Sequence, residues 1–441
     1  MIGEQDLIEF VTSQRWFGSK TRNVIAARIV DRAVLRDVEP RLEVALVEVG
    51  FETGTHETYQ LLLGDDDLDA LADPRHVREL VHMIRGGATV QAEEGIVEFR
   101  PIEGFAGLGT ELLEARSIGT EQSNTSIVFD EELILKAFRR LEAGINPELE
   151  LLRFLTEHGF ANIAPLGGWY AYNGRAMNTT LGILQQYVRG ARDGWELALE
   201  EVLDAPERFL GRLRRLGEVT GEMHSVLGSD TSDANFCPET PSVESLGLLT
   251  ATVDEEIARI FLTLPEGDES VAPIVGRGEE VREQLRLLTH AGSIGRVIRH
   301  HGDYHLGQTL WSVSDWVILD FEGEPARPLP ERRRKRSPLR DVAGMLRSFA
   351  YVVSAAEILR GASAPQGWED RAREQFLDGY LGAVDLSLLP SGQEAIRRLL
   401  AVYELEKAVY ELRYELDNRP EWVRIPVAGI QRLIDQETHP G

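Results

Sequence analysis

The stretch His301-Gly-Asp-Tyr-His-Leu-Gly-Gln308, followed after a short interval by Asp320-Phe-Glu-Gly323, decides how this chain is interpreted. An enzyme that transfers a phosphoryl group needs one carboxylate to hold the acceptor hydroxyl and take its proton. It also needs an amide and a second carboxylate to hold Mg²⁺ on the nucleotide phosphates. Asp303, Gln308 and Asp320 supply these groups in this order. Either motif alone is a common turn composition, but the two together predict phosphoryl transfer.

The residues between the two motifs are predicted to form a β-hairpin. The polar turn Ser312-Val-Ser-Asp315 separates an apolar run from the second apolar run Trp316-Val-Ile-Leu319. Such a hairpin brings Asp320 back beside Asp303. Mg²⁺ prefers oxygen ligands and keeps several waters, so one amide oxygen, one or two carboxylates and the phosphates suffice. Glu322 is the candidate for the extra carboxylate.

Two histidines, His301 and His305, flank Asp303 at i and i+4. Such a pair suggests a metal site, but no third ligand follows nearby, and zinc sites in proteins use at least three protein ligands. We therefore predict that both histidines brace the loop by hydrogen bonds. Asp341 is predicted either to support the same loop or to be an acid at a helix N-terminus, where the helix dipole favours it.

Composition is that of a globular protein of two or three domains, with 441 residues, 43% hydrophobic residues and a formal net charge of −26. Nucleic acids and anionic membranes are bound by basic surfaces, so neither is an expected partner. The single cysteine, Cys237, excludes an internal disulfide and fits a reducing compartment. Because neither a signal peptide nor an apolar run of membrane-spanning length is evident, we expect a cytoplasmic protein.

The chain is predicted to be α+β and to have three parts. Residues 1–103 alternate short apolar and polar runs, which indicates a small strand-rich subdomain. Residues 104–195 begin with a glycine-rich boundary and form a β-rich subdomain that binds the nucleotide. Residues 196–441 show long amphipathic patterns typical of helices and contain the catalytic motifs. A P-loop motif is absent from the sequence, which argues against a P-loop kinase.

A lysine in the middle of the apolar strand Leu133-Ile-Leu-Lys-Ala-Phe138 needs a charged partner. In kinases such a lysine holds the nucleotide phosphates and pairs with a glutamate on the following helix. Asn146-Pro147 opens that helix well, and Glu148 and Glu150 lie in its first turn. These glutamates point to different faces, so one of them is expected to pair with Lys136, and we favour Glu148. A lysine that extends from an edge strand to solvent is the alternative.

Two paired strands, Leu112–Ile118 and Thr125–Phe129, are predicted before the lysine strand. The loop around which they pair, Gly119-Thr-Glu-Gln-Ser-Asn-Thr-Ser126, is rich in hydroxyls and amides. Its backbone N–H groups and the side chains of Ser123, Thr125 and Ser126 are predicted to bind phosphates. An ordinary polar hairpin is the alternative.

An adenine-binding hinge is expected where an apolar strand ends in the glycine-broken connector Arg189-Gly-Ala-Arg-Asp-Gly-Trp195. The carbonyl of Gln186 and the backbone N–H of Val188 are the candidate contacts with the adenine ring. ATP, bound with Mg²⁺, is therefore the expected cofactor.

The segment from residue 410 to residue 422 gives the best clue to the acceptor. It is predicted to form the last helix of the chain, with four polar or aromatic side chains on one face at i, i+4, i+7 and i+11. These four are Glu411, Glu415, Asn418 and Trp422. Carboxylates and amides bind the vicinal hydroxyls of sugars, and an indole covers the C–H face of a sugar ring. The segment is thus a candidate sugar site, with a surface helix of ion pairs as the alternative.

These segments, together with Gln14-Arg-Trp-Phe-Gly-Ser-Lys20 and Ser337-Pro-Leu-Arg-Asp-Val-Ala-Gly-Met-Leu-Arg-Ser-Phe349, resemble the maltokinase family over nearly the whole chain. The resemblance implies a bilobal fold similar to aminoglycoside phosphotransferases and eukaryotic protein kinases. Such a fold has an N-terminal cap subdomain, an intermediate ATP-binding subdomain and a helical C-lobe. The resemblance also implies ATP-dependent phosphorylation of maltose at the anomeric hydroxyl, giving maltose 1-phosphate for α-glucan and glycogen synthesis. Association with a trehalose-isomerising enzyme is implied by family analogy alone.

The resemblance assigns roles position by position. Asp303 matches the catalytic base, Gln308 and Asp320 match the metal ligands, and Lys136 matches the nucleotide lysine. The segment 410–422 matches the sugar-binding helix. The candidate maltose contacts are Asp303, Glu411, Tyr414, Glu415, Asn418, Arg419 and Trp422.

The second motif favours maltokinase over a close alternative. Related glucosamine kinases share His-Gly-Asp and the glutamine but continue with Asp-Phe-Asp-Gly-Asn-Pro, whereas this chain has Glu322 and Glu324. A kinase of another sugar or amino sugar stays open. So does a non-catalytic kinase-fold binding module, although such a module is expected to lack the base or a metal ligand.

Overall fold

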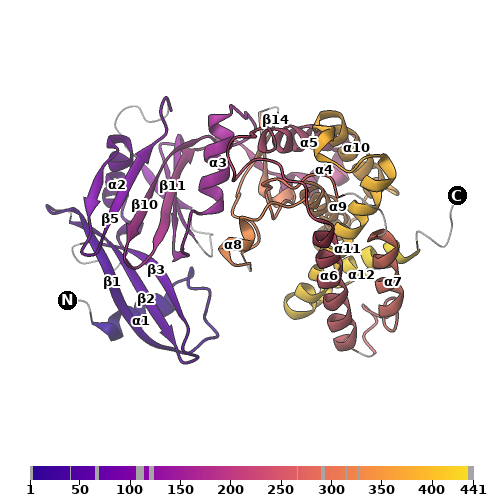
Figure 1. Ribbon diagram of the computed structural model, residues 1–441, viewed down its shortest axis with the longest axis horizontal. Helices are drawn as coiled ribbons and strands as arrows, with labels where there is room; N and C mark the ends of the chain where they lie inside the picture. The colour runs from indigo at the N-terminus through magenta and orange to yellow at the C-terminus, as the bar shows by residue number, and fades with distance from the viewer. Residues whose placement is uncertain are drawn as a thin grey trace. The chain divides into compact units, whose positions relative to one another are not determined.

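The computed structural model describes residues 3–39, 41–64, 69–105, 114–118, 124–265, 267–289, 294–313, 315–325 and 327–435. The chain forms two compact units (Figure 1). One is Met1–Gly190 with Arg327–Leu329, and the other is Ala191–Ala326 with Pro330–Gly441. The first unit is rich in strands and the second is mostly helical. The predicted α+β class, with a β-rich N-terminal part and a helical C-terminal part, is confirmed.

The described strands of the first unit form two antiparallel sheets. The four-stranded sheet has the order β1-β2-β3-β9, with β1 Val24–Arg36, β2 Leu42–Phe51, β3 His56–Leu63 and β9 Arg140–Leu141. The seven-stranded sheet has the order β4-β5-β10-β11-β8-β7-β6, with β4 Thr89–Gln91, β5 Gly95–Pro101, β6 Ala115–Ile118, β7 Asn124–Phe129, β8 Leu133–Phe138, β10 Leu166–Gly174 and β11 Asn178–Gln186.

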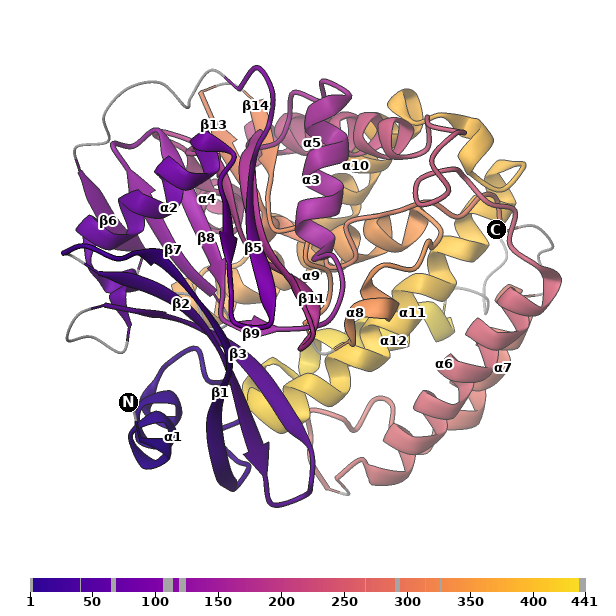
Figure 2. The same cartoon turned by 60° about the vertical axis from the view of Figure 1, so that its left-hand side comes forward.

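Helices cover parts of these sheets, namely α1 Glu4–Ser13, α2 Pro74–Gly86 and α3 Pro147–Glu157. Helix α1 packs on β1, α2 on β5 and α3 on β10 (Figure 2). The strand-rich reading of the first hundred residues missed α1 and α2. The motif Gln14-Arg-Trp-Phe-Gly-Ser-Lys20 follows α1 and fills the core of the four-stranded sheet. Its Trp16 and Phe17 rings both lie 5.5 Å from the ring of Tyr59.

Each of the two sheets contains strands from both sides of the predicted boundary at residue 103. Strand β5, from the N-terminal part, pairs along its length with β10 of the seven-stranded sheet. Strand β9 follows β8 but pairs with β3 of the four-stranded sheet. The glycine-rich boundary itself lies largely outside the described residues. The cap and the nucleotide-binding part are therefore interlaced within one compact unit.

The second unit is built mainly from long helices. They are α4 Gly194–Asp204, α5 Pro206–Leu227, α6 Val243–Thr263, α7 Gly278–Thr289, α9 Leu339–Arg360, α10 Trp368–Ala383, α11 Gln393–Asn418 and α12 Arg424–Asp435, with the short α8 at Leu329–Arg332. A small sheet has the order β12-β13-β14, with β12 Arg192–Asp193, β13 Thr309–Ser312 and β14 Asp315–Ile318. Strands β13 and β14 pair antiparallel, which confirms the predicted hairpin.

Two glycines allow α5 and α10 to approach each other closely. A Cβ atom added to Gly217 would lie 2.0 Å from the carbonyl oxygen of Phe376, and one added to Gly379 would lie 2.0 Å from that of Arg214.

Helix α9 packs against α4, α10 and α11. Among the described residues it is the helix long and apolar enough to cross a membrane, an apolar run that the sequence reading missed. Within the protein, 67% of this apolar stretch is buried, so α9 has the surroundings of a helix in a protein core.

Candidate active site

The first motif forms a loop in the second unit, between the strand-like segment at Ile298 and the hairpin β13–β14. Gly302 has φ +89°, a left-handed conformation that side chains rarely adopt, and a short 3-10 helix, Leu306–Gln308, ends the loop. Asp303 lies between these two features, with its side chain 24% exposed. The loop thus presents the predicted base at its surface on a constrained backbone.

Asp341, at the start of α9, supports this loop. Its Oδ2 accepts a hydrogen bond from the backbone N–H of His301 at 2.8 Å, and its Oδ1 accepts one from Gly302 at 2.9 Å. His224 Nε2 lies 3.2 Å from Oδ2, and His224 Nδ1 lies 3.2 Å from the hydroxyl of Tyr380. Burial raises the pKa of a carboxyl group, but the neighbouring His300 and His224 hold the pKa of Asp341 below its usual value. The loop-supporting role is the one that these contacts favour.

The two histidines of the motif brace the loop, as predicted. His301 Nε2 lies 2.8 Å from the carbonyl oxygen of Leu319, at the end of the hairpin. His305 Nδ1 accepts a hydrogen bond from the backbone N–H of Gly307 at 3.1 Å, and its Nε2 lies 4.0 Å from Asp303 Oδ2. Burial lowers the pKa of His305, which favours the neutral ring.

The hairpin brings Gln308 and Asp320 together. Gln308 Nε2 donates a hydrogen bond to Asp320 Oδ2 at 3.1 Å, and the carbonyl oxygen of Gln308 accepts one from Leu319 at 3.0 Å. Asp320 has φ +59°, which is rare for a residue other than glycine. Such backbone strain is concentrated at functional sites. Glu322 follows two residues later and is half-buried.

These three side chains fit a magnesium ion. They offer an amide oxygen and two carboxylates, the hard oxygen donors that Mg²⁺ prefers, and two of the three are in direct contact. Their role as metal ligands stays a prediction, since it follows from the donor types and from this proximity.

The segment 410–422 does not form one continuous helix. Helix α11 ends at Asn418, and Trp422 lies in a separate 3-10 helix, Pro420–Trp422. The predicted i+11 position of Trp422 on a shared face is therefore wrong, because Pro420 cannot continue the ladder of α11. Trp422 is instead 8% exposed and stacks on Tyr351, with ring centroids 6.1 Å apart.

Both glutamates of the predicted sugar face are engaged by side chains of the second unit. Arg347 donates to Glu411 Oε2 from Nε at 3.0 Å and from Nη2 at 2.7 Å. Glu415 is 1% exposed and accepts hydrogen bonds from the hydroxyl of Tyr351 at 3.0 Å and from Arg419 at 2.7 Å. Burial raises the pKa of Glu415. Much of their bonding capacity is thus internal, which leaves less of it for a sugar than the sequence predicted.

The other candidate sugar contacts are more open. Asn418 is exposed, and its Nδ2 donates to the carbonyl oxygen of Tyr414 at 2.8 Å. Tyr414 is 45% exposed. The guanidinium of Arg419 lies 5.3 Å from the Tyr414 ring and 5.2 Å from the Trp422 ring. Of the candidate sugar contacts at the end of α11, Tyr414, Asn418 and Arg419 are therefore the exposed ones.

Sequence patterns missed Lys407, on α11. Its Nζ lies 3.3 Å from Asp303 Oδ1 and 3.5 Å from Glu324 Oε1. Glu324 also lies 3.9 Å from Arg340. In sequence Lys407 is an ordinary charge on an amphipathic helix, 104 residues from Asp303. Only the folded chain shows that it contacts the predicted base.

In the first unit, Lys136 lies in the middle of β8 and pairs with Glu148. Its Nζ is 2.8 Å from Glu148 Oε2, and the two side chains are 11% and 3% exposed. Helix α3 begins at Pro147, and the Asn146 side chain caps it by accepting a hydrogen bond from the backbone N–H of Glu148 at 2.8 Å. This is the helix start that the sequence predicted, and it places Glu148 against the strand lysine.

The strand predicted to begin at Thr125 is present as β7, Asn124–Phe129. Thr125 and Ser126 belong to strand β7, and Ser123 lies outside the described residues. Ser126 pairs across the sheet with Lys136, so the two side chains share a face, and Ser126 is 1% exposed. Thr125 lies on the opposite face, where its hydroxyl accepts a hydrogen bond from Arg139 Nε at 2.7 Å. Thr125 and Ser126 therefore do not share a face, and the binding of phosphate by either side chain stays a prediction.

The hinge candidates lie where β11 ends. Gln186 is the last residue of the strand and is exposed, and its backbone N–H donates to the carbonyl oxygen of Pro165 at 3.0 Å. Val188 follows in the connector and is half-buried. Between these two residues, the backbone N–H of Tyr187 donates a hydrogen bond to the carbonyl oxygen of Glu132 at 2.7 Å. This bond connects the segment after β11 to the turn before β8. The adenine contact of Gln186 and Val188 stays a prediction.

The fold is that of a kinase-like phosphotransferase. A solved structure, glucosamine kinase in complex with glucosamine, ADP and inorganic phosphate, superposes with a TM-score of 0.74 at 20% identity. The superposition covers 98% of this chain and 100% of that chain. A second crystal form of glucosamine kinase gives a TM-score of 0.73 at 20% identity, covering 97% of this chain and 99% of that chain.

Two kinds of sequence similarity accompany this fold. Residues 10–90 match the family described as Maltokinase N-terminal cap domain. A glucosamine kinase of Mycolicibacterium smegmatis is 25% identical over 339 residues, which cover 73% of this chain and 80% of the relative. A glucosamine kinase of Streptacidiphilus jiangxiensis is 26% identical over 350 residues, which cover 76% of each chain. All of these similarities support a kinase that phosphorylates a sugar. They differ in the sugar that is named, which is maltose for the cap domain and glucosamine for the relatives and the solved structures.

Proposed function

We propose that this chain phosphorylates maltose at the anomeric hydroxyl with ATP, giving maltose 1-phosphate for α-glucan and glycogen synthesis. The observation that supports maltose as the acceptor is the match of residues 10–90 to the maltokinase N-terminal cap domain. The acceptor part of the site is compatible with a sugar, because the end of α11 exposes a phenol, an amide and a guanidinium. These groups bind hydroxyls and stack on a sugar ring.

Asp303 acts as the base in this reaction. One of its carboxylate oxygens accepts the proton of the anomeric hydroxyl while the sugar oxygen forms a bond to the γ-phosphorus. The bond from that phosphorus to the β,γ-bridging oxygen breaks, and ADP leaves with the electron pair. Lys407 Nζ lies 3.3 Å from Asp303 Oδ1 and holds that carboxylate by an ion pair.

Each unit carries its own candidate residues for the nucleotide and its metal. Lys136, held by Glu148, binds the phosphates from the first unit. Gln308, Asp320 and Glu322 would hold Mg²⁺, which neutralises charge on the phosphates when it is bound. The carboxylate of Asp320 is held by its hydrogen bond from Gln308, on a left-handed backbone of the kind found at functional sites.

A second candidate function is phosphorylation of glucosamine. It is favoured by the names of the relatives that match three quarters of the chain and of the solved structures that match nearly all of it. An amino sugar carries an ammonium, which the acidic residues around Asp303 could bind. The two candidates therefore differ in the charge of the acceptor.

The test is ADP release from ATP and Mg²⁺ with maltose, glucose, glucosamine and an aminoglycoside as acceptors, followed by identification of the product. The proposal expects maltose to give the highest kcat/KM and to yield the 1-phosphate. Turnover with glucosamine but none with maltose would sink the first function and support the second. No turnover with any acceptor would favour a binding module.

A further inference from the structure

Lys407 places a primary ammonium directly at the predicted base. Its Nζ lies 3.3 Å from Asp303 Oδ1 and 3.5 Å from Glu324 Oε1, and its side chain is 23% exposed. The ring of Tyr410, on the same helix, lies 5.3 Å from the ammonium. The other oxygen of Asp303 faces His305 at 4.0 Å. A cation is therefore a fixed part of the surroundings of the acceptor hydroxyl.

The identity of this residue is informative. The chain has 47 basic residues, of which four are lysines, Lys20, Lys136, Lys335 and Lys407. All others are arginines, so a lysine is unusual wherever it occurs in this chain. Arginine presents a planar fork of donors, whereas lysine presents a compact ammonium on an alkyl chain. A primary ammonium is also the group that distinguishes glucosamine from glucose.

The ammonium of Lys407 pairs with two carboxylates, the kind of group that binds the ammonium of an amino sugar. Burial lowers the pKa of a lysine, but Asp303 and Glu324 outweigh this effect and raise the pKa of Lys407 above its usual value. Lys407 thus stays a cation and already neutralises both carboxylates. Arg340, 3.9 Å from Glu324 and 3.0 Å from Glu406, neutralises the neighbouring acids. A second ammonium at this place meets a like charge, and Asp303 and Glu324 are already paired with Lys407.

We propose that Lys407 determines acceptor specificity by serving as a built-in ammonium, so that the site selects neutral sugars over amino sugars. This inference rests on the proposed phosphorylation of a neutral sugar. A neutral acceptor leaves the contact of Lys407 with Asp303 intact. A cationic acceptor has to displace Lys407 or bind against it. Lys407 is thus a specificity-determining residue rather than the base.

The first test needs no substitution, because glucose and glucosamine differ only in a hydroxyl and an ammonium at one carbon. Each is measured as a competitive inhibitor of maltose phosphorylation by the unchanged enzyme. The expected inhibition constant of glucosamine is at least tenfold above that of glucose. Equal constants, or tighter binding of glucosamine, would overturn the inference even if maltose is the best acceptor.

The second test replaces Lys407 by Met, which keeps the length of the side chain and removes its charge. The ratio of kcat/KM for glucose to that for glucosamine is expected to fall at least tenfold, mainly through KM for glucosamine. Lys20→Met, at an exposed lysine of the first unit, is the matched control and is expected to leave the ratio unchanged. An unchanged ratio in a folded Lys407→Met protein contradicts the inference.

A rescue experiment separates a charge effect from damage to the fold. Lys407→Ala is assayed with maltose in the presence and absence of ethylammonium, and folding is checked by the thermal midpoint. A rise of at least threefold in maltose turnover with ethylammonium supports the built-in ammonium, and no rise counts against it. Failure of the proposed function is seen separately, as absence of maltose turnover by the unchanged enzyme.

Discussion

Asp341 holds His301 by a 2.8 Å hydrogen bond from the backbone N–H of the histidine to one carboxylate oxygen. The other oxygen accepts the next N–H along the chain, from Gly302, at 2.9 Å. A carboxylate accepts at both of its oxygens, whereas an amide accepts at only one. The loop that carries Asp303 therefore depends on a buried group with two acceptor oxygens.

Asp341→Asn is expected to leave one of these two buried N–H groups without its acceptor, at a cost of about 1–3 kcal/mol. We expect a lower thermal midpoint and at least a tenfold loss of kcat, because the loop is loosened. Asp378→Asn is the control, since Asp378 is 57% exposed in its pair with Arg214. Normal kcat in Asp341→Asn would show that the loop is set by other contacts.

Asp303→Asn is expected to lower kcat by roughly 10²–10⁴, the range associated with a lost general base. The dissociation constant of the ATP complex, measured by calorimetry without acceptor, is expected to change less than threefold, since Lys136 and Glu148 are untouched. If this variant phosphorylates its sugar at nearly the unchanged rate, Asp303 is not the base.

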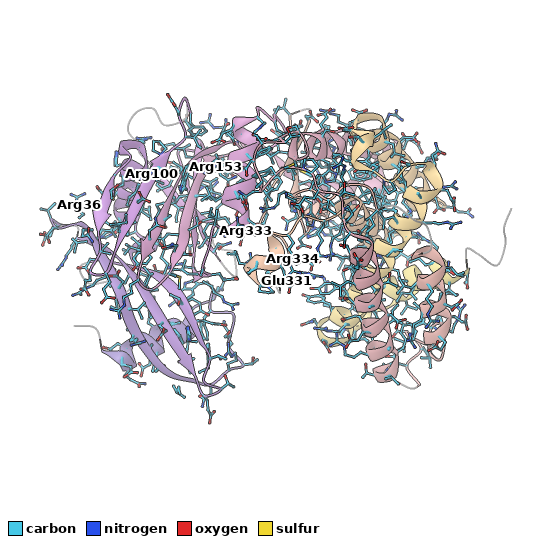
Figure 3. The ribbon with its side chains drawn as sticks, in the orientation of Figure 1. Arg36, Arg100, Arg153, Glu331, Arg333 and Arg334 are labelled. Atoms are coloured by element: carbon cyan, nitrogen blue, oxygen red, sulfur yellow. The ribbon has the colours of Figure 1, made fainter. Side chains whose placement is uncertain are left out.

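Lys136→Met removes the cation that pairs with the buried carboxylate of Glu148, and breaking a buried pair in this way costs about 3–5 kcal/mol. Both the thermal midpoint and kcat/KM for ATP are expected to fall. The control is Arg153→Met on α3 (Figure 3), since Arg153 is 45% exposed and lies 3.8 Å from Glu157. Such an exposed pair contributes about 0–1 kcal/mol. Equal effects of the two substitutions would contradict the role assigned to Lys136.

Acid is expected to destabilise the second unit through His300. Burial lowers the pKa of this histidine to about 3, from 6.5, with Arg340, Arg336 and Arg299 acting in the same direction and Asp341 opposing them. The unfolded chain binds a proton below pH 6.5 and the folded chain does not, so stability is fully present above pH 6.5. It is then lost towards pH 3, at about 1.4 kcal/mol per pH unit.

The measurement is the thermal midpoint from pH 7.5 to pH 4 for the unchanged protein and for His300→Gln, which cannot take up this proton. Between pH 7.5 and pH 4, the thermal midpoint of the variant is expected to fall by fewer degrees than that of the unchanged protein. The exposed His56→Gln is the control for loss of an imidazole ring. A variant that follows the pH profile of the unchanged protein would exclude His300 as the cause.

Patterns over a few neighbouring residues correctly predicted individual strands, turns and helix starts. The hairpin after Gln308, the strand around Lys136 and the helix start at Pro147 follow from alternation, turn residues and proline geometry. The split of α11 from Trp422 was also readable, because Pro420 follows Asn418 by two residues. Strand alternation likewise places Thr125 and Ser126 on opposite faces.

Contacts between distant segments were not predictable from these patterns. Lys407 and Asp303 are 104 residues apart, and a lysine on an amphipathic helix carries no sign of its partner. The ion pair of Glu411 with Arg347 and the hydrogen bond of Glu415 with Tyr351 both depend on residues of another helix, α9. Pairing of β9 with β3 is equally a property of the folded unit.

The interlaced sheets of the first unit have a consequence for engineering. A chain shortened to begin after residue 103 would lose β5 and leave the edge of β10 without its neighbour. An exposed edge strand is a template for association with other chains, so such a fragment is prone to aggregate. The N-terminal region is thus not a detachable module, and swapping it between relatives would have to carry β9 and β10 along or preserve their pairing surfaces.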